Sequence, residues 1–164
     1  MPAATTATDA TLMSDLTIRR ARQGDLAAIV ALLADDSLGH SREDPSLPLD
    51  ARYAAAFAAI DADPNQLLAV ADRAGQIVAC LQLTFIPGLS RRGLWRGQIE
   101  SVRVASGARG EGLGERMLEW AIGICRERGC GLVQLTTDKS RSDARRFYEK
   151  LGFTASHEGM KLAL

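Results

Sequence analysis

Apolar residues recur along this chain in two spacings, one typical of amphipathic helices and the other of strands. Spacings of three and four residues predict helices, and Asp25 and Asp50 stand where the first two would be capped. The helices expected in this way cover residues 26–36, 51–63, 113–128 and 142–151. The expected strands cover residues 16–20, 67–71, 76–86, 95–105, 132–136, 153–155 and 160–164.

The order of these segments indicates how the strands are arranged. The turn at 73–75 joins two strands directly, which is the signature of a hairpin. Later strands alternate with helices instead. We therefore predict an α/β fold whose sheet is mixed rather than purely parallel.

Length and end composition define the domain organisation. The 164 residues suit one domain, and the hydrophobic share of 46% is enough for a buried core. Residues 1–15 are rich in Ala and Thr and predict a flexible leader. Residues 16–164 then form the single folded domain.

Charge and residue counts narrow the classes of function. Twenty basic and twenty acidic residues balance, which disfavours a nucleic-acid binder. Two histidines far apart and three unpaired-looking cysteines predict neither a metal site nor a disulfide framework. The chain shows no secretory signal and no apolar run long enough for a bilayer, so we expect a cytoplasmic protein that does not bind membranes.

The segment most informative about chemistry is the strand 95–105 with the glycine-rich turn and helix behind it. A turn of this kind leaves backbone N–H groups at the positive end of a helix, which is a site for phosphate. Gly110, Gly112 and Gly114 permit close approach, and Arg109 adds a positive charge. The alternative is that these glycines only make a turn.

The identity of the phosphate ligand is not decided by this turn alone. A P-loop would need Gly-Lys followed by Ser or Thr, and no such run exists. The glycine spacing also departs from the dinucleotide fingerprint G-x-G-x-x-G, although Asp138 stands where that motif expects a ribose contact. The strand pairs that precede the motif argue against a dinucleotide fold.

Three stretches together resemble one known family. Arg109–Gly114 matches the pattern Q/R-x-x-G-x-G/A of the GNAT superfamily of acyl-CoA N-acyltransferases. The stretch 144–153 is similar to the later signature of that superfamily, and 18–21 with 25–26 to its usual opening. Order and spacing agree over residues 16–164. The resemblance implies a central, mostly antiparallel sheet flanked by helices.

The resemblance also implies how coenzyme A would be held. Main-chain N–H groups of the turn would bind the pyrophosphate, and the preceding strand would contact the pantetheine arm. An N–H near Val102 would polarise the thioester carbonyl. The turn residues in this role are Arg109, Gly110, Glu111, Gly112, Leu113 and Gly114, and the strand residues are Val102, Arg103 and Val104.

Two side chains are candidate catalysts. The family pattern places Tyr148 where a phenol would protonate the departing thiolate, the alternative being a tyrosine packed under the sheet. Glu100 is the candidate base because strand alternation puts it on the face of Val102 and Val104, an anion among apolar neighbours. Its alternative is a structural carboxylate paired with a neighbouring arginine.

The function implied is transfer of the acetyl group of acetyl-CoA to a primary amine, by direct attack in a ternary complex. The acceptor is a small-molecule or peptide amine that the sequence does not identify, and a homodimer is common among relatives. Two alternatives stay open: a non-catalytic acyl-CoA-binding module on the same fold, and a dinucleotide-binding enzyme. No metal is expected.

Overall fold

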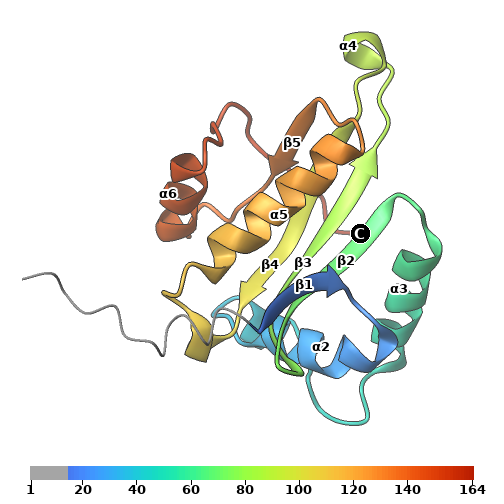
Figure 1. Cartoon of the computed structure of the whole chain (residues 1–164), viewed down its shortest axis with the longest axis vertical. Coiled ribbons are helices and arrows are strands. Elements are labelled where there is room, and N and C mark those ends of the chain that lie inside the picture. Colours follow the sequence, from blue (N-terminus) through green and yellow to red (C-terminus); the bar gives the residue numbers. More distant parts are fainter. Residues whose placement is uncertain (1–14) are drawn as a thin grey trace, which may run out of the picture.

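The computed structural model describes residues 15–164, and a five-stranded sheet forms its centre (Figure 1). The strands lie side by side in chain order; the first four pair antiparallel, and the last pair is parallel. This confirms the predicted mixed, mostly antiparallel sheet. The strands are β1 (Leu16–Arg20), β2 (Gln66–Arg73), β3 (Gln76–Ile86), β4 (Arg96–Val104) and β5 (Leu132–Leu135).

Helices cover both faces of the sheet, with α5 on one face and α2 and α3 on the other (Figure 1). The four expected helices are confirmed as α2 (Leu26–Ala34), α3 (Ala51–Ala62), α5 (Leu113–Glu127) and α6 (Ser142–Lys150). Shorter turns are η1 (Gln23–Asp25), η2 (Gly39–Ser41), α4 (Ser90–Gly93) and η3 (Ser106–Ala108). Within residues 15–164 no helix combines the length and the apolar character that a membrane crossing needs.

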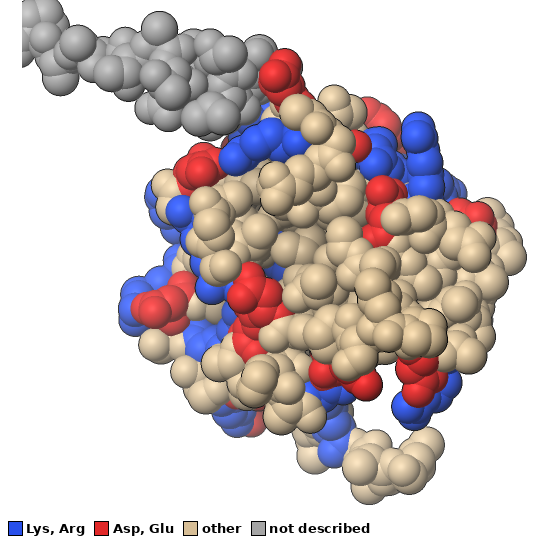
Figure 2. Space-filling view, turned by 90° about the horizontal axis from the view of Figure 1, so that it is seen from below, with Lys and Arg blue, Asp and Glu red and all other residues tan. Residues whose placement is uncertain are grey.

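Charged side chains are intermixed on the face drawn in Figure 2, where acidic groups lie among basic ones. This agrees with the zero net charge of the whole sequence. A cluster in which positive or negative charge predominates therefore differs from the rest of this face.

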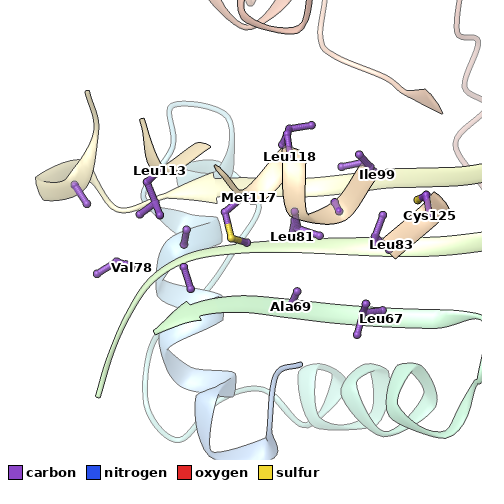
Figure 3. Close-up of a cluster of buried hydrophobic side chains, with 14 of the residues drawn as sticks. Leu67, Ala69, Val78, Leu81, Leu83, Ile99, Leu113, Met117, Leu118 and Cys125 are labelled. Atoms are coloured by element: carbon purple, nitrogen blue, oxygen red, sulfur yellow. The ribbon is translucent and has the colours of Figure 1, made fainter. Parts of the chain in front are cut away.

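The larger hydrophobic core lies between the sheet and α5 (Figure 3). Met117 and Leu118 of α5 are fully buried against Leu81, Leu83 and their neighbours. Each side chain of this size contributes about 1.5–3 kcal/mol when it leaves water. Alternate residues of the same strands form a second cluster under α2 and α3. Its buried members are Ala21, Ile29, Leu32, Phe57, Leu68, Val70 and Cys80.

The predicted last strands, 153–155 and 160–164, are wrong, because within residues 15–164 the sheet ends at β5. Met160, Leu162 and Leu164 alternate as a strand would, but 86% or more of each side chain is exposed. Alternation favours a strand only where a neighbouring edge supplies hydrogen bonds and a face to cover. The leader predicted for residues 1–15 lies, except for Asp15, outside the described residues.

The two predicted caps have different outcomes. Asp50 accepts a hydrogen bond from the Arg52 amide at 2.9 Å and caps α3 as expected. Asp25 stands at the cap position of α2, but its carboxylate does not bond that helix. It instead accepts from Arg19 Nη1 at 2.8 Å, while Arg19 Nη2 donates to Asp72 at 2.9 Å. The Arg19 guanidinium of β1 therefore joins Asp25, just before α2, to Asp72 of β2.

We expect Asp25→Asn to lower the free energy of unfolding by about 2 kcal/mol at neutral pH, since a charged hydrogen-bond network is broken. Hydrogen bonds from Arg19 lower the pKa of Asp25 below its ordinary 3.8. The stabilisation is therefore complete above that value and disappears as the pH falls through the folded-state pKa. Denaturant unfolding at neutral and acid pH measures both effects. The matched control is Asp61→Asn, which removes an exposed pair at 3.7 Å and should cost little.

Gly97 of β4 lies directly under Cys125 of α5. A Cβ at Gly97 would stand 2.3 Å from the Cys125 sulfur, which is fully buried. We expect Gly97→Ala to destabilise the protein by about 1–3 kcal/mol through overpacking. Adding Cys125→Ala should return part of that loss, as measured by unfolding of the single and double variants. A double variant that loses the sum of both single effects would contradict this contact.

Candidate functional site

The turn before α5 has the backbone geometry of an anion site. Gly110 and Gly112 have φ values of 83° and 74°, which favour glycine, and Gly112 is the cap residue of the helix. The first backbone hydrogen bond of α5 runs from the Arg116 amide to the Gly112 carbonyl at 3.2 Å. The amides of Leu113 and Gly114 come before that bond, so they lie at the positive end of the helix.

Neighbouring side chains hold this turn in place. Arg109 donates to the Val104 carbonyl at 3.1 Å and to the Asp35 carbonyl at 2.7 Å, so its charge also fastens the end of α2. Glu111, a carboxylate within the turn, pairs with Arg73 of β2 at 2.6 Å. The negative charge of the turn is thus neutralised by a residue from the far end of the β2–β3 hairpin.

The edge of β4 that leads to this turn is open. Pairing between β4 and β5 covers only the first part of β4 and ends at Ile99 and Leu135. The Ala105 amide donates to Val78 on β3 at 2.9 Å, so alternation turns the main-chain groups of Val102 and Val104 the other way. These two residues therefore present backbone groups on the side of β4 away from β3, whereas the main chain of Arg103 faces β3.

A β-bulge interrupts β4 in the same stretch. Cys80 pairs with Arg103 but Gln82 pairs with Glu100, so an extra residue lies between them on β4. Ser101, with φ of 54°, is in that interval. An extra residue reverses the alternation of side chains beyond it.

This bulge corrects the predicted placement of Glu100. Ile99, Val102 and Val104 all belong to the core under α5, so Glu100 and Arg103 face the opposite side, toward α2. The expectation that Glu100 shares a face with Val102 and Val104 is wrong, because strict alternation does not count the extra residue. The alternative of a paired structural carboxylate is not supported either. Within residues 15–164 the exposed Glu100 side chain has neither an ion pair nor a hydrogen bond.

Tyr148 comes from α6 and lies half-buried beside the core. Its ring packs edge to face with Phe147 at 5.3 Å and Phe153 at 6.0 Å between centroids. Burial raises the pKa of its phenol, and Arg141 and Arg103 act in the opposite direction. The hydroxyl therefore keeps its proton at neutral pH. Packing and proton donation are compatible, since the ring does the first and the hydroxyl the second.

Sequence reasoning missed a charge cluster that joins three elements. Arg103 of β4 and Arg141, just before α6, approach the same Asp36 carboxylate oxygen at 3.0 Å and 3.5 Å. Only 8% of the Asp36 side chain is exposed. The three residues are far apart in sequence and share no local motif, so no sequence signal joins them. Within residues 15–164, no group of His, Cys, Asp and Glu side chains is placed to hold a metal ion.

Comparison with known proteins decides the family. The family model described as Acetyltransferase (GNAT) family matches residues 26–153, which is most of the chain. The chain belongs to the GNAT acetyltransferase family. The resemblance seen in the sequence motifs is thereby confirmed, and members of this family use acetyl-CoA. The dinucleotide alternative is wrong, because four strands of the sheet are antiparallel where that fold is mostly parallel.

Two curated GNAT relatives act on small amines. The chain is 36% identical to an aminoalkylphosphonate N-acetyltransferase of Salmonella typhimurium over 101 residues, 62% of this chain and 65% of the relative. The match therefore spans less than two thirds of that relative. The chain is 32% identical to a glucosamine 6-phosphate N-acetyltransferase of Trypanosoma brucei brucei, over 92% of this chain and 97% of the relative.

A solved structure from Bacillus halodurans C-125, described as a transcriptional regulator, has the same fold. It is 52% identical to this chain with a TM-score of 0.89, and the match covers 91% of this chain and 99% of that one. The fold of this chain thus has an experimental counterpart that covers 91% of it.

Proposed function

We propose that residues 16–164 form one catalytic domain that transfers the acetyl group of acetyl-CoA to a primary amine by direct attack in a ternary complex. One observation carries this: the open edge of β4 runs straight into the N-terminal turn of α5. An extended pantetheine arm fits along Val102 and Val104, as an added strand would. Its diphosphate then reaches the amides of residues 109–114.

We assign acetyl-CoA and the amine acceptor to opposite sides of β4. Val102 and Val104 pack under α5, whereas Glu100 and Arg103 face α2. We place the amine on the side of Glu100, whose free carboxylate takes a proton from the amine directly or through water. The exposed Glu100 side chain is accessible to an incoming acceptor.

The remaining steps use the open edge and Tyr148. The amine nitrogen bonds to the thioester carbon, and an amide of the open edge near Val102 stabilises the oxyanion that forms. The carbon–sulfur bond then breaks and Tyr148 gives its proton to the departing thiolate. The phenol is protonated before the transfer, and Arg141 and Arg103, which act to lower its pKa against the effect of burial, would stabilise the phenolate that forms. A neutral amine loses one proton and the sulfur gains one, so the transfer balances. A protonated amine first loses one further proton, which passes through Glu100 to solvent.

The acceptor we propose is a small-molecule amine. Both curated relatives act on small amines that carry phosphorus, a phosphonate in one and a phosphate ester in the other. We also propose a cytoplasmic location, since Cys80, Cys125 and Cys130 are free thiols, as a reducing compartment keeps them. A non-catalytic acyl-CoA-binding module is the alternative, and the regulator from Bacillus halodurans motivates testing it.

The decisive experiment measures binding and turnover separately. We expect acetyl-CoA to raise the melting temperature, and small amines to release free thiol from acetyl-CoA. Tyr148→Phe should lower kcat about 100-fold with little change in the KM for acetyl-CoA, since it removes a proton donor. Glu100→Gln should lower the rate most at pH values at which the free amine is protonated. Tyr53→Phe is the matched control, because that hydroxyl donates to Glu43 instead. Binding without thiol release from any amine would leave the non-catalytic alternative.

The pair between Arg73 and Glu111 predicts a second effect on the coenzyme. Without Arg73, the Glu111 carboxylate would stand uncompensated in the turn that holds diphosphate. We expect Arg73→Ala to weaken acetyl-CoA binding about 2- to 5-fold, more at low salt. Glu111→Gln in the same chain should restore the affinity, which calorimetric titration of the two variants would measure. A double variant that binds as weakly as Arg73→Ala would show that Arg73 acts through structure rather than through charge.

A further inference from the structure

Positive charge exceeds negative charge where α2, β4 and the start of α6 meet. Two guanidinium groups, from Arg103 and Arg141, share the single carboxylate of Asp36. The exposed fractions of the side chains are 20% for Arg103, 38% for Arg141 and 8% for Asp36. The two guanidinium groups therefore carry one more positive charge than the carboxylate that they share.

Such an excess is costly unless a further anion compensates it. The Nε of Arg103 is buried without a hydrogen-bond partner, and so is Oδ2 of Asp36, whose contacts with the arginines are ion pairs only. Asp138 does not supply the missing charge, because its carboxylate accepts from Ser140 and lies in the field of Arg42 and Lys161. Within residues 15–164, no carboxylate other than Asp36 forms an ion pair with Arg103 or Arg141.

The cluster adjoins the proposed reaction centre on the acceptor side. Arg103 faces α2 together with Glu100, and its Nη1 donates to the Val102 carbonyl at 2.9 Å on the open edge. Both arginines also act electrostatically on the Tyr148 phenol. The cradle at the start of α5 has its own amides for the diphosphate, so these arginines are not needed there.

We propose that Arg103 and Arg141 form a subsite for an anionic group, phosphate or phosphonate, carried by the amine acceptor. This rests on the proposed acetyl transfer and narrows its substrate class. Arginine forks match the oxygens of such groups, and a doubly charged group offsets the excess better than a carboxylate does. Asp36 is a positioning residue that holds both guanidinium groups in place.

Matched acceptors test the subsite. Aminoethylphosphonate is compared with aminoethanol, and glucosamine 6-phosphate with glucosamine, in the thiol-release assay. We expect the phosphorus-bearing member of at least one pair to have the higher kcat/KM. Arg141→Gln should lower that kcat/KM about 10- to 100-fold, the effect of losing a charged hydrogen bond, and lower the kcat/KM of the neutral amine far less. The KM for acetyl-CoA should not change.

Two further variants and one titration keep the interpretation specific. Arg145→Gln is the control, because that exposed arginine pairs with Glu149 within α6. This substitution should change kcat/KM for neither the neutral nor the anionic acceptor. Asp36→Asn should weaken binding of the anionic acceptor although Arg103 and Arg141 are still present. The melting temperature of the variant checks that it is folded. Titration of aminoethylphosphonate into the protein with coenzyme A bound should release heat that Arg141→Gln abolishes, which tests the subsite without turnover.

Three results would overturn the subsite. An increased KM for acetyl-CoA in Arg141→Gln would assign the cluster to the coenzyme. Equal losses of kcat with neutral and anionic amines would assign it to the reacting thioester. Preference for the neutral amines, with thiol released, would exclude an anionic acceptor and leave acetyl transfer intact. If no amine releases thiol although acetyl-CoA binds, the proposed function fails instead.

Discussion

The candidate site depends on one extra residue in β4. The bulge around Ser101 lets the strand keep its hydrogen bonds to β3 while the side chains beyond it change faces. Val102 and Val104 thereby stay in the core under α5, and Glu100 and Arg103 both turn toward α2. A strand without the bulge would send an apolar side chain to the acceptor side and a charge into the core. The proposed separation of coenzyme and acceptor sides rests on this local irregularity.

Much of the fold was predictable because it is encoded locally. Helical spacing placed α5 and α6, and the turn residues placed the hairpin of β2 and β3. The glycines predicted a turn before α5, and Gly110 and Gly112 adopt positive φ in that turn. The tail beyond Phe153 was not predictable, since its alternating apolar residues say nothing of whether a neighbouring edge exists.

The arrangement of the site was less predictable, because it depends on contacts that are not encoded locally in the sequence. A single inserted residue leaves no signature in composition or periodicity, so Glu100 was assigned to the wrong face. The cluster of Asp36, Arg103 and Arg141 joins residues separated by up to 105 positions, and only the folded chain brings the charges together. Asp25 shows the limit on a small scale: its sequence position suits a cap of α2, but its carboxylate accepts from Arg19 and from the Arg22 amide instead.

The unfinished pairing of β4 with β5 has a consequence for the protein in solution. An exposed strand edge is a template on which another chain can add, and many proteins protect such edges with charged side chains. Here Arg103 covers the Val102 carbonyl and Arg109 covers the Val104 carbonyl, so each acceptor on the edge already has a donor from its own chain. A second strand that added at this edge would therefore find these two carbonyls already bonded.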